Sequence, residues 1–150
     1  MRTLLAVVPF ALASAAFGQA PANSEATFRQ ADVGSVPYGF YRGTVLSAEG
    51  PFPRLQVRLQ GMMWKGKTFH GDGTFTNHWL GGLKAVRATT EVGPSVLDGR
   101  PAVLARYRRF APVFGGDIDE LREITPGVWL GRRFDAITGK PKNWFLLEAR

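Results

Sequence analysis

Hydrophobic and polar residues alternate along several short stretches of the chain. Residues 54–60 read RLQVRLQ, which places Leu55, Val57 and Leu59 on one side and polar residues on the other. A period of two is typical of a β-strand with one buried face. Further apolar, aromatic and turn residues follow, and the segment 54–79 is interpreted as one or two long hairpins.

Similar stretches recur at near-regular spacing, separated by Gly, Pro and Asp-Gly turn signals. The other segments that read as strands are 38–46, 83–92, 101–110, 117–124, 128–131 and 143–150. About eight to ten short strands without a convincing amphipathic helix indicate an all-β sandwich or barrel. The short turns favour an antiparallel up-and-down barrel, whose closure would also remove exposed strand edges.

The first residues have the pattern of a secretory signal peptide. Arg2 gives a positive start, and the apolar run 4–16 is too short for a membrane span. Small residues follow it, so residues 1–18 are assigned to a signal peptide and the protein is expected to be periplasmic or secreted.

The next residues, 19–36, are small and polar and lack clean periodicity. They are interpreted as a flexible leader, with a short helix over Ser24–Gln30 and Ser24 as its N-cap as the alternative. The β-barrel domain is then expected over residues 37–150, as a single domain.

Composition narrows the possible partners. The 150 residues include no cysteine, which excludes disulfides and a lipid-modified N-terminal cysteine. The net charge of +7 comes from dispersed basic residues, among them Arg106, Arg108 and Arg109. In an exported protein these favour an anionic envelope surface over nucleic acid as a partner. The oligomeric state is left open.

Three passages resemble the Gly-x-Trp-x-Gly domain family of small bacterial β proteins. They are GFYRG at 39–43, WKGKTF at 64–69, and the closing strands with GVWLG at 127–131 and WFLLE at 144–148. The first passage has Tyr41 where the family has its tryptophan. The resemblance implies a lipocalin-like or calycin-like barrel and carries no agreed activity.

Candidate chemistry is sparse. His70 and His78, with Asp72 between them, are the only clustered metal-ligand types, whereas zinc needs three or four ligands. They are interpreted as ordinary strand residues, and 71–73 as a turn. No cofactor, metal site or catalytic residue is assigned, and an enzymatic role resting on His70 and Asp72 is the least favoured hypothesis.

Arg122 shares a predicted strand face with Glu120, Ile118 and Ile124, and a buried charge needs a partner. Three placements follow: a structural plug stacked on Tyr41 or a tryptophan, exposure to solvent, or contact with a ligand inside the barrel. The structural plug is favoured.

Large side chains on the predicted inner faces would either fill the barrel or line a cavity. The candidate lining residues are Tyr41, Trp64, Phe69, Trp79, Tyr107, Arg122 and Trp129. The first functional hypothesis is an exported, non-catalytic barrel that binds a small apolar or amphipathic molecule. The alternative is a filled barrel that acts as a basic cell-envelope interaction module without a cavity.

Overall fold

The eight strands of the protein close into one antiparallel barrel in the order β1-β2-β3-β4-β5-β6-β7-β8. The computed structural model describes residues 23–108 and 116–150, and the predicted signal peptide and Arg109 lie outside them. The strands are β1 (Gly39–Ala48), β2 (Trp64–His70), β3 (Thr74–Trp79), β4 (Lys84–Pro94), β5 (Pro101–Arg106), β6 (Asp117–Thr125), β7 (Val128–Asp135) and β8 (Pro141–Ala149). The predicted up-and-down β-barrel is confirmed, because every strand pairs with its neighbours in sequence and β1 pairs with β8.

The prediction of a strand over 54–60 is wrong, because this segment lies in helix α2 (Pro53–Met63). Leu55 and Leu59 are half exposed, at 53% and 50%, rather than buried in a sheet. Two signals for a helix were present. Pro53 occupies the first turn, where its missing N–H does no harm, and Leu55, Leu59 and Met62 have the spacing of one helical face.

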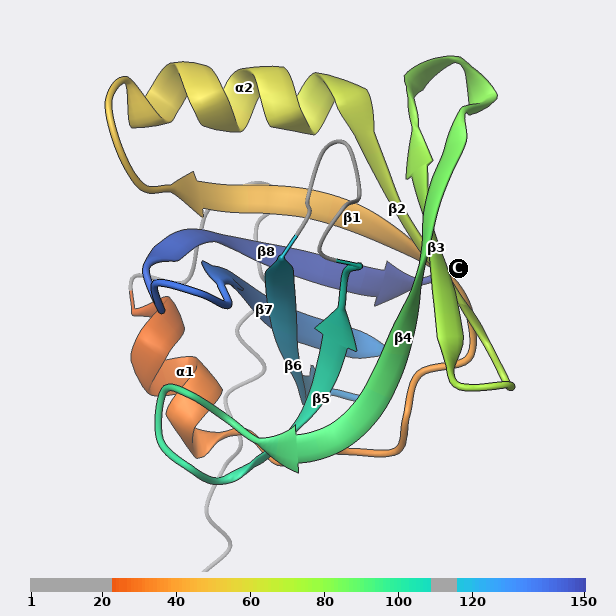
Figure 1. Cartoon of the computed structure of the whole chain (residues 1–150), viewed down its shortest axis with the longest axis vertical. Coiled ribbons are helices and arrows are strands. Elements are labelled where there is room, and N and C mark those ends of the chain that lie inside the picture. The colour runs from red at the N-terminus through yellow and green to blue at the C-terminus, as the bar shows by residue number, and fades with distance from the viewer. Residues whose placement is uncertain (1–22, 109–115) are drawn as a thin grey trace, which may run out of the picture.

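The barrel has two different ends. At one end α2 and the turn η1 (Leu80–Gly82) stand side by side, along the top of Figure 1. The register explains this, since Trp64 pairs with Trp79 and the chain enters β2 from α2 and leaves β3 into η1. The opposite end is covered by the segment before β1, where Asp32 bridges to Glu123 and Val33 packs on the interior.

Helix α1 (Ser24–Gln30) packs on the outside of the barrel wall. Its Phe28 is fully buried and meets Trp144 edge-on, with ring centroids 5.7 Å apart. The short-helix interpretation of this segment is therefore the one found, although Asn23 rather than Ser24 is the N-cap. Through Phe28, this part of the predicted leader packs against the barrel.

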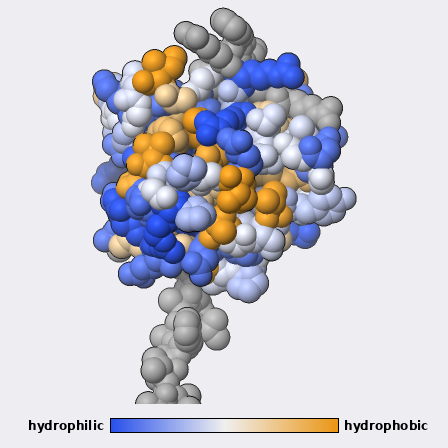
Figure 2. All heavy atoms as spheres, turned by 60° about the horizontal axis from the view of Figure 1, so that its bottom comes forward, coloured by the Kyte–Doolittle hydropathy of each residue, from blue (hydrophilic) through white to orange (hydrophobic). Residues whose placement is uncertain are grey.

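The surface is mixed in character. Figure 2, which brings the lower edge of Figure 1 forward, shows apolar patches separated by strongly hydrophilic residues. Within residues 23–108 and 116–150, no helix has the length and apolar character needed to cross a bilayer.

Candidate functional site

A cleft of about 980 Å³ lies between α2 and the adjacent end of the barrel. Its size is at the upper end of the range of small-molecule sites. Apolar side chains from α2, β1, β2, β3 and β8 form one part of its wall: Leu59, Met63, Val45, Trp64, Trp79 and Phe145. Charged and amide groups line another part: Glu49, Gln56, Gln60, Asp117, Arg133, Asp135, Lys140, Lys142 and Asn143.

The cleft exists because β1 and β2 separate toward this end. β1 pairs with β2 only over Gly39–Arg42, whereas its pairing with β8 continues as far as Ala48. The chain between the two strands forms α2, which lies against both. A helix therefore covers the gap that a continued strand pairing would have closed.

Trp64 forms the wall between the cleft and the packed interior. Its ring lies directly over Gly43, where an added Cβ would come within 2.5 Å of the indole. It meets Phe145 edge-on with centroids 5.3 Å apart, and its indole N–H donates to Asn77 Oδ1 at 3.3 Å. Only a glycine at position 43 leaves room for this placement.

A charged cluster lies buried behind the cleft. Arg133 donates from Nε to Asp119 Oδ1 at 2.6 Å and from Nη2 to Oδ2 at 3.0 Å. Lys67 Nζ lies 2.8 Å from Asp119 Oδ2. Lys67 and Asp119 have no exposed surface, and Arg133 reaches the cleft. Two cations thus share one carboxylate, which leaves this cluster with one net positive charge.

Neutral groups complete the cluster. Lys67 donates to Asn77 Oδ1 at 3.0 Å and also to the Tyr107 hydroxyl. Tyr107 in turn donates to Asp119 Oδ2 at 3.0 Å. The ammonium of Lys67 also lies 4.5 Å from the centroid of the Phe75 ring, within the range of a cation–π contact.

The surroundings shift the pKa values of these groups. Burial, aided by the charge of Arg133, lowers the pKa of Lys67 to about 8 even though Asp119 opposes the shift. Burial alone would raise the pKa of Asp119, but Arg133 and Lys67 outweigh it and hold the pKa at about 2. Burial and the nearby Asp119 raise the pKa of Tyr107 well above its usual value. At neutral pH the carboxylate and both cations are charged.

The rim of the cleft carries further ion pairs. Lys142 Nζ lies 2.5 Å from Asp117 Oδ1 and 3.8 Å from Asp135 Oδ2. Burial raises the pKa of Asp117, while Lys142 opposes that shift. These pairs join the starts of β6 and β8 to the end of β7 beside the cleft.

Asn143 is the polar lining residue with an unsatisfied atom. Its side chain is 6% exposed, and its amide donates to Gln60 Oε1 of α2 at 3.0 Å. Among the described residues, no donor reaches its Oδ1. A buried acceptor without a donor is costly, and this oxygen has almost no surface open to the cleft.

Most of the predicted lining residues are inside the barrel, but few face the cleft. Trp64 and Trp79 line it. The remaining four aromatic candidates are buried in the packed interior: Tyr41, Phe69, Tyr107 and Trp129. The interior of the barrel itself is therefore largely filled.

Arg122 does not line the barrel, which corrects its inclusion among the candidate lining residues. It lies beneath α1, where its guanidinium is 4.5 Å from the centroid of Phe28. It donates to the Phe28 carbonyl at 2.9 Å and to both carboxylate oxygens of Asp98, at 2.7 and 2.6 Å. The favoured placement, a plug stacked on Tyr41 or a tryptophan, is therefore wrong, because Arg122 is buried outside the barrel wall and stacks on Phe28.

The two histidines hydrogen-bond to threonines of neighbouring strands. His70 Nε2 lies 2.9 Å from Thr76 Oγ1, and His78 Nε2 lies 2.7 Å from Thr68 Oγ1. His70 pairs with Thr74, and His78 is four residues further along β3. The two histidines are therefore roughly 13 Å apart along the sheet. Asp72 accepts hydrogen bonds from Thr74 within the turn. Within the described part of the chain, no group of three potential ligands forms a metal site.

The sequence interpretation missed Lys67, Asp119 and Arg133. A signal existed in β6, where the inward face carries Asp119 and Leu121 rather than Glu120 and Arg122. Lys67 likewise lies two residues before Phe69 and shares its face. A lysine and an aspartate on inward faces of different strands would have indicated a buried ion pair.

Comparisons with known proteins bear on the fold. No protein-family model matches the sequence, and no curated protein matches it. The chain is similar to a solved structure described as a protein from Thermomonospora curvata, with a TM-score of 0.50 and 16% identity over 75% of each chain. Similarity at this level of identity extends to the fold alone.

Proposed function

We propose that this protein binds a small amphipathic molecule in the cleft between α2 and the barrel, without catalysis. The observation that carries the proposal is the composition of the cleft. Its wall joins the aromatic rings of Trp64, Trp79 and Phe145 to the buried guanidinium of Arg133. Binding sites of this kind combine an apolar wall with a few placed polar groups.

The polar groups suggest how a ligand would be oriented. Its apolar part would lie against Trp64 and Leu59, and its polar head would lie near Arg133 and Asn143. The signal-peptide pattern adds the proposal that the protein performs this role after export.

A dye titration tests the proposal. Anilinonaphthalene sulfonate, an amphipathic anion, should bind the purified protein saturably and should be displaced by medium-chain amphiphiles. Tryptophan fluorescence should change in parallel, since Trp64 and Trp79 line the cleft. Absence of saturable binding at micromolar protein would contradict the proposal.

A matched pair of helix variants locates the site. Leu59 lines the cleft and Leu55 does not, although both are about half exposed on the same helix. Leu59→Trp should therefore fill the cleft and weaken dye binding at least tenfold, whereas Leu55→Trp should leave it nearly unchanged. Equal effects of the two substitutions would place the dye elsewhere.

A further inference from the structure

Helix α2 carries an exposed apolar face, and Leu59 lies at the edge of this face that borders the cleft. Leu55, Leu59 and Met62 follow the spacing of one helical face and are 53%, 50% and 56% exposed. Val57 lies on the opposite side and packs on the barrel core. No residue of α2 is buried. The exposed apolar face therefore does not contribute to the packing of the helix on the barrel.

Further exposed apolar side chains lie at both ends of the helix. Phe52, immediately before it, is 77% exposed. Because Trp64 pairs with Trp79, η1 lies beside the C-terminal end of α2, and it contributes Leu80 at 60% and Leu83 just after it at 63%. We call this surface the α2 face, formed by Phe52, Leu55, Leu59, Met62, Leu80 and Leu83.

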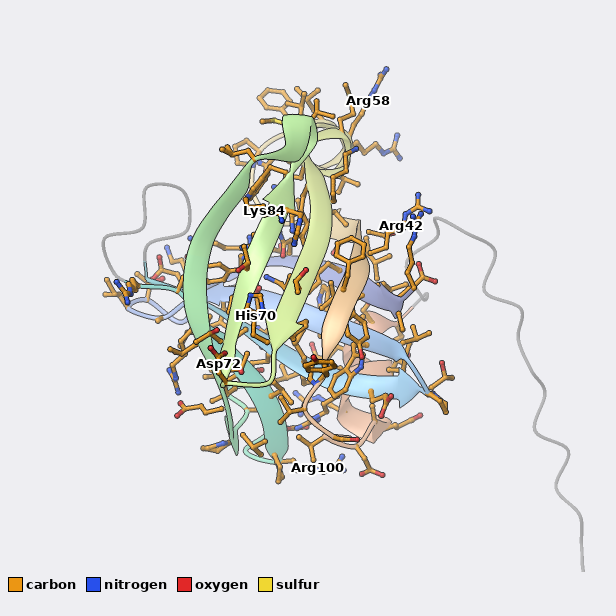
Figure 3. The ribbon with its side chains drawn as sticks, turned by 90° about the vertical axis from the view of Figure 1, so that its right-hand side faces the viewer. Arg42, Arg58, His70, Asp72, Lys84 and Arg100 are labelled. Atoms are coloured by element: carbon orange, nitrogen blue, oxygen red, sulfur yellow. The ribbon has the colours of Figure 1, made fainter. Side chains whose placement is uncertain are left out.

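The charges around the α2 face are mostly positive. Residues 50–71 and 73–90 contain no aspartate or glutamate. Exposed cations flank the apolar side chains, namely Arg54, Arg58, Lys65 and Lys84. Figure 3 shows Arg58 at this end of the molecule with Lys84 below the β3–β4 turn, and Arg100 at the opposite end. The nearby acids are Glu49, which is exposed, and Asp117 and Asp135, and all three line the cleft.

We propose that the α2 face docks on an anionic lipid bilayer. An amphipathic helix with aliphatic and aromatic residues beside arginines is the element that lies in the headgroup region of membranes. The excess of positive charge complements acidic headgroups, and the exposed Phe52, Leu55 and Met62 supply the apolar surface that inserts. Docking would also bring the mouth of the cleft to the bilayer, but it does not depend on the cleft binding a ligand.

Vesicle cosedimentation tests this. The protein should bind vesicles of phosphatidylcholine with 30% phosphatidylglycerol at low salt, and binding should weaken as salt screens the charges. Each cation near an anionic surface contributes roughly a fivefold gain in binding, so R54Q/R58Q should bind about 25-fold more weakly. The matched pair R42Q/R150Q removes the same charge elsewhere and should change binding less than about twofold. Equal losses in both pairs, or equal binding to pure phosphatidylcholine, would overturn the proposal.

Insertion is tested separately. The chain has no cysteine, so an environment-sensitive nitrobenzoxadiazole label can be placed at Met62→Cys or, as a control at the opposite end, at Val96→Cys. The two positions are similarly exposed, at 56% and 62%. Vesicles should shift the emission of the label to the blue at position 62 only. No shift at position 62, or retention on polyglutamate without vesicle binding, would overturn the proposal in favour of an acidic protein partner. Loss of dye binding with intact vesicle binding would contradict only the proposed ligand site.

Discussion

Arg133 and Asp119 form a two-point ion pair in the barrel interior, with Nε–Oδ1 and Nη2–Oδ2 distances of 2.6 and 3.0 Å. This geometry is the strongest form of arginine–carboxylate contact. Lys67 pairs with the same carboxylate, so Asp119 is the one anion that stabilises both buried cations of the cluster. The cluster is therefore more sensitive to loss of its anion than to loss of either cation.

Replacement of Asp119 should be strongly destabilising. Asp119→Asn leaves Lys67 and Arg133 buried without an anion, and the free energy of unfolding should fall by roughly 3–5 kcal/mol. Lys67→Met leaves a neutral Asp119–Arg133 pair and should cost clearly less. Urea unfolding of the two variants measures the difference. A larger loss for Lys67→Met would contradict this account of the cluster.

Lys67 should also make stability depend on pH in the basic range. Its pKa is about 8 in the folded state and near 10.5 when unfolded, so between these values the unfolded chain binds more protons. The free energy of unfolding should therefore rise from pH 8 to 10. The raised pKa of Tyr107 should reverse the trend above pH 10. The rise should disappear in Lys67→Met, and an unchanged slope in that variant would show that another group causes it.

The ion pair between Arg122 and Asp98 should stabilise the packing of α1 on the barrel. Asp98 holds Arg122 in place, and the hydrogen bonds from Arg122 lower the pKa of Asp98 to about 2. The folded pKa of Asp98 lies below its usual value near 3.8, so the contact between Asp98 and Arg122 stabilises the fold fully above about pH 4. This stabilisation is lost as the pH falls toward 2.

Asp98→Asn should therefore lower stability at pH 7 and make the acid unfolding transition less steep. Hydrogen exchange should report faster opening of α1, whose Phe28 carbonyl accepts from Arg122. Arg29→Gln is a control, since it removes only the exposed pair with Glu25 on the same helix. Equal effects of the two substitutions would contradict a role for Arg122 in holding α1.

Gly43 and Gly61 should respond in opposite ways to alanine. A Cβ at Gly43 would meet the Trp64 ring at 2.5 Å, so Gly43→Ala should displace the indole, change its fluorescence and cost about 1–3 kcal/mol. Gly61 lies in α2 with nothing within 4 Å of an added Cβ. Gly61→Ala should stabilise by about 0.5–1 kcal/mol, because alanine is the better helix former. Thermal unfolding of both variants provides the comparison.

The sequence by itself determined the barrel. Runs of β-forming residues in β5 and β7, turn signals between strands and aromatic residues are local features, and neighbouring strands in a meander need only short connections to pair. The same local information placed Trp64 and Trp79 on the inner side. It also identified Arg122 as a buried charge that needs a partner, although not which partner.

Only the tertiary structure decided the form of residues 54–60 and the position of the cleft. RLQVRLQ satisfies both a strand and a helix pattern, and the divergence of β1 from β2 after Arg42 leaves a gap that a helix covers. The ion pairs of Asp119 join β2, β6 and β7 across the barrel, and Asp98 meets Arg122 from another connection. Such contacts depend on which strands close the barrel and at what register, and no pattern within one strand contains that information.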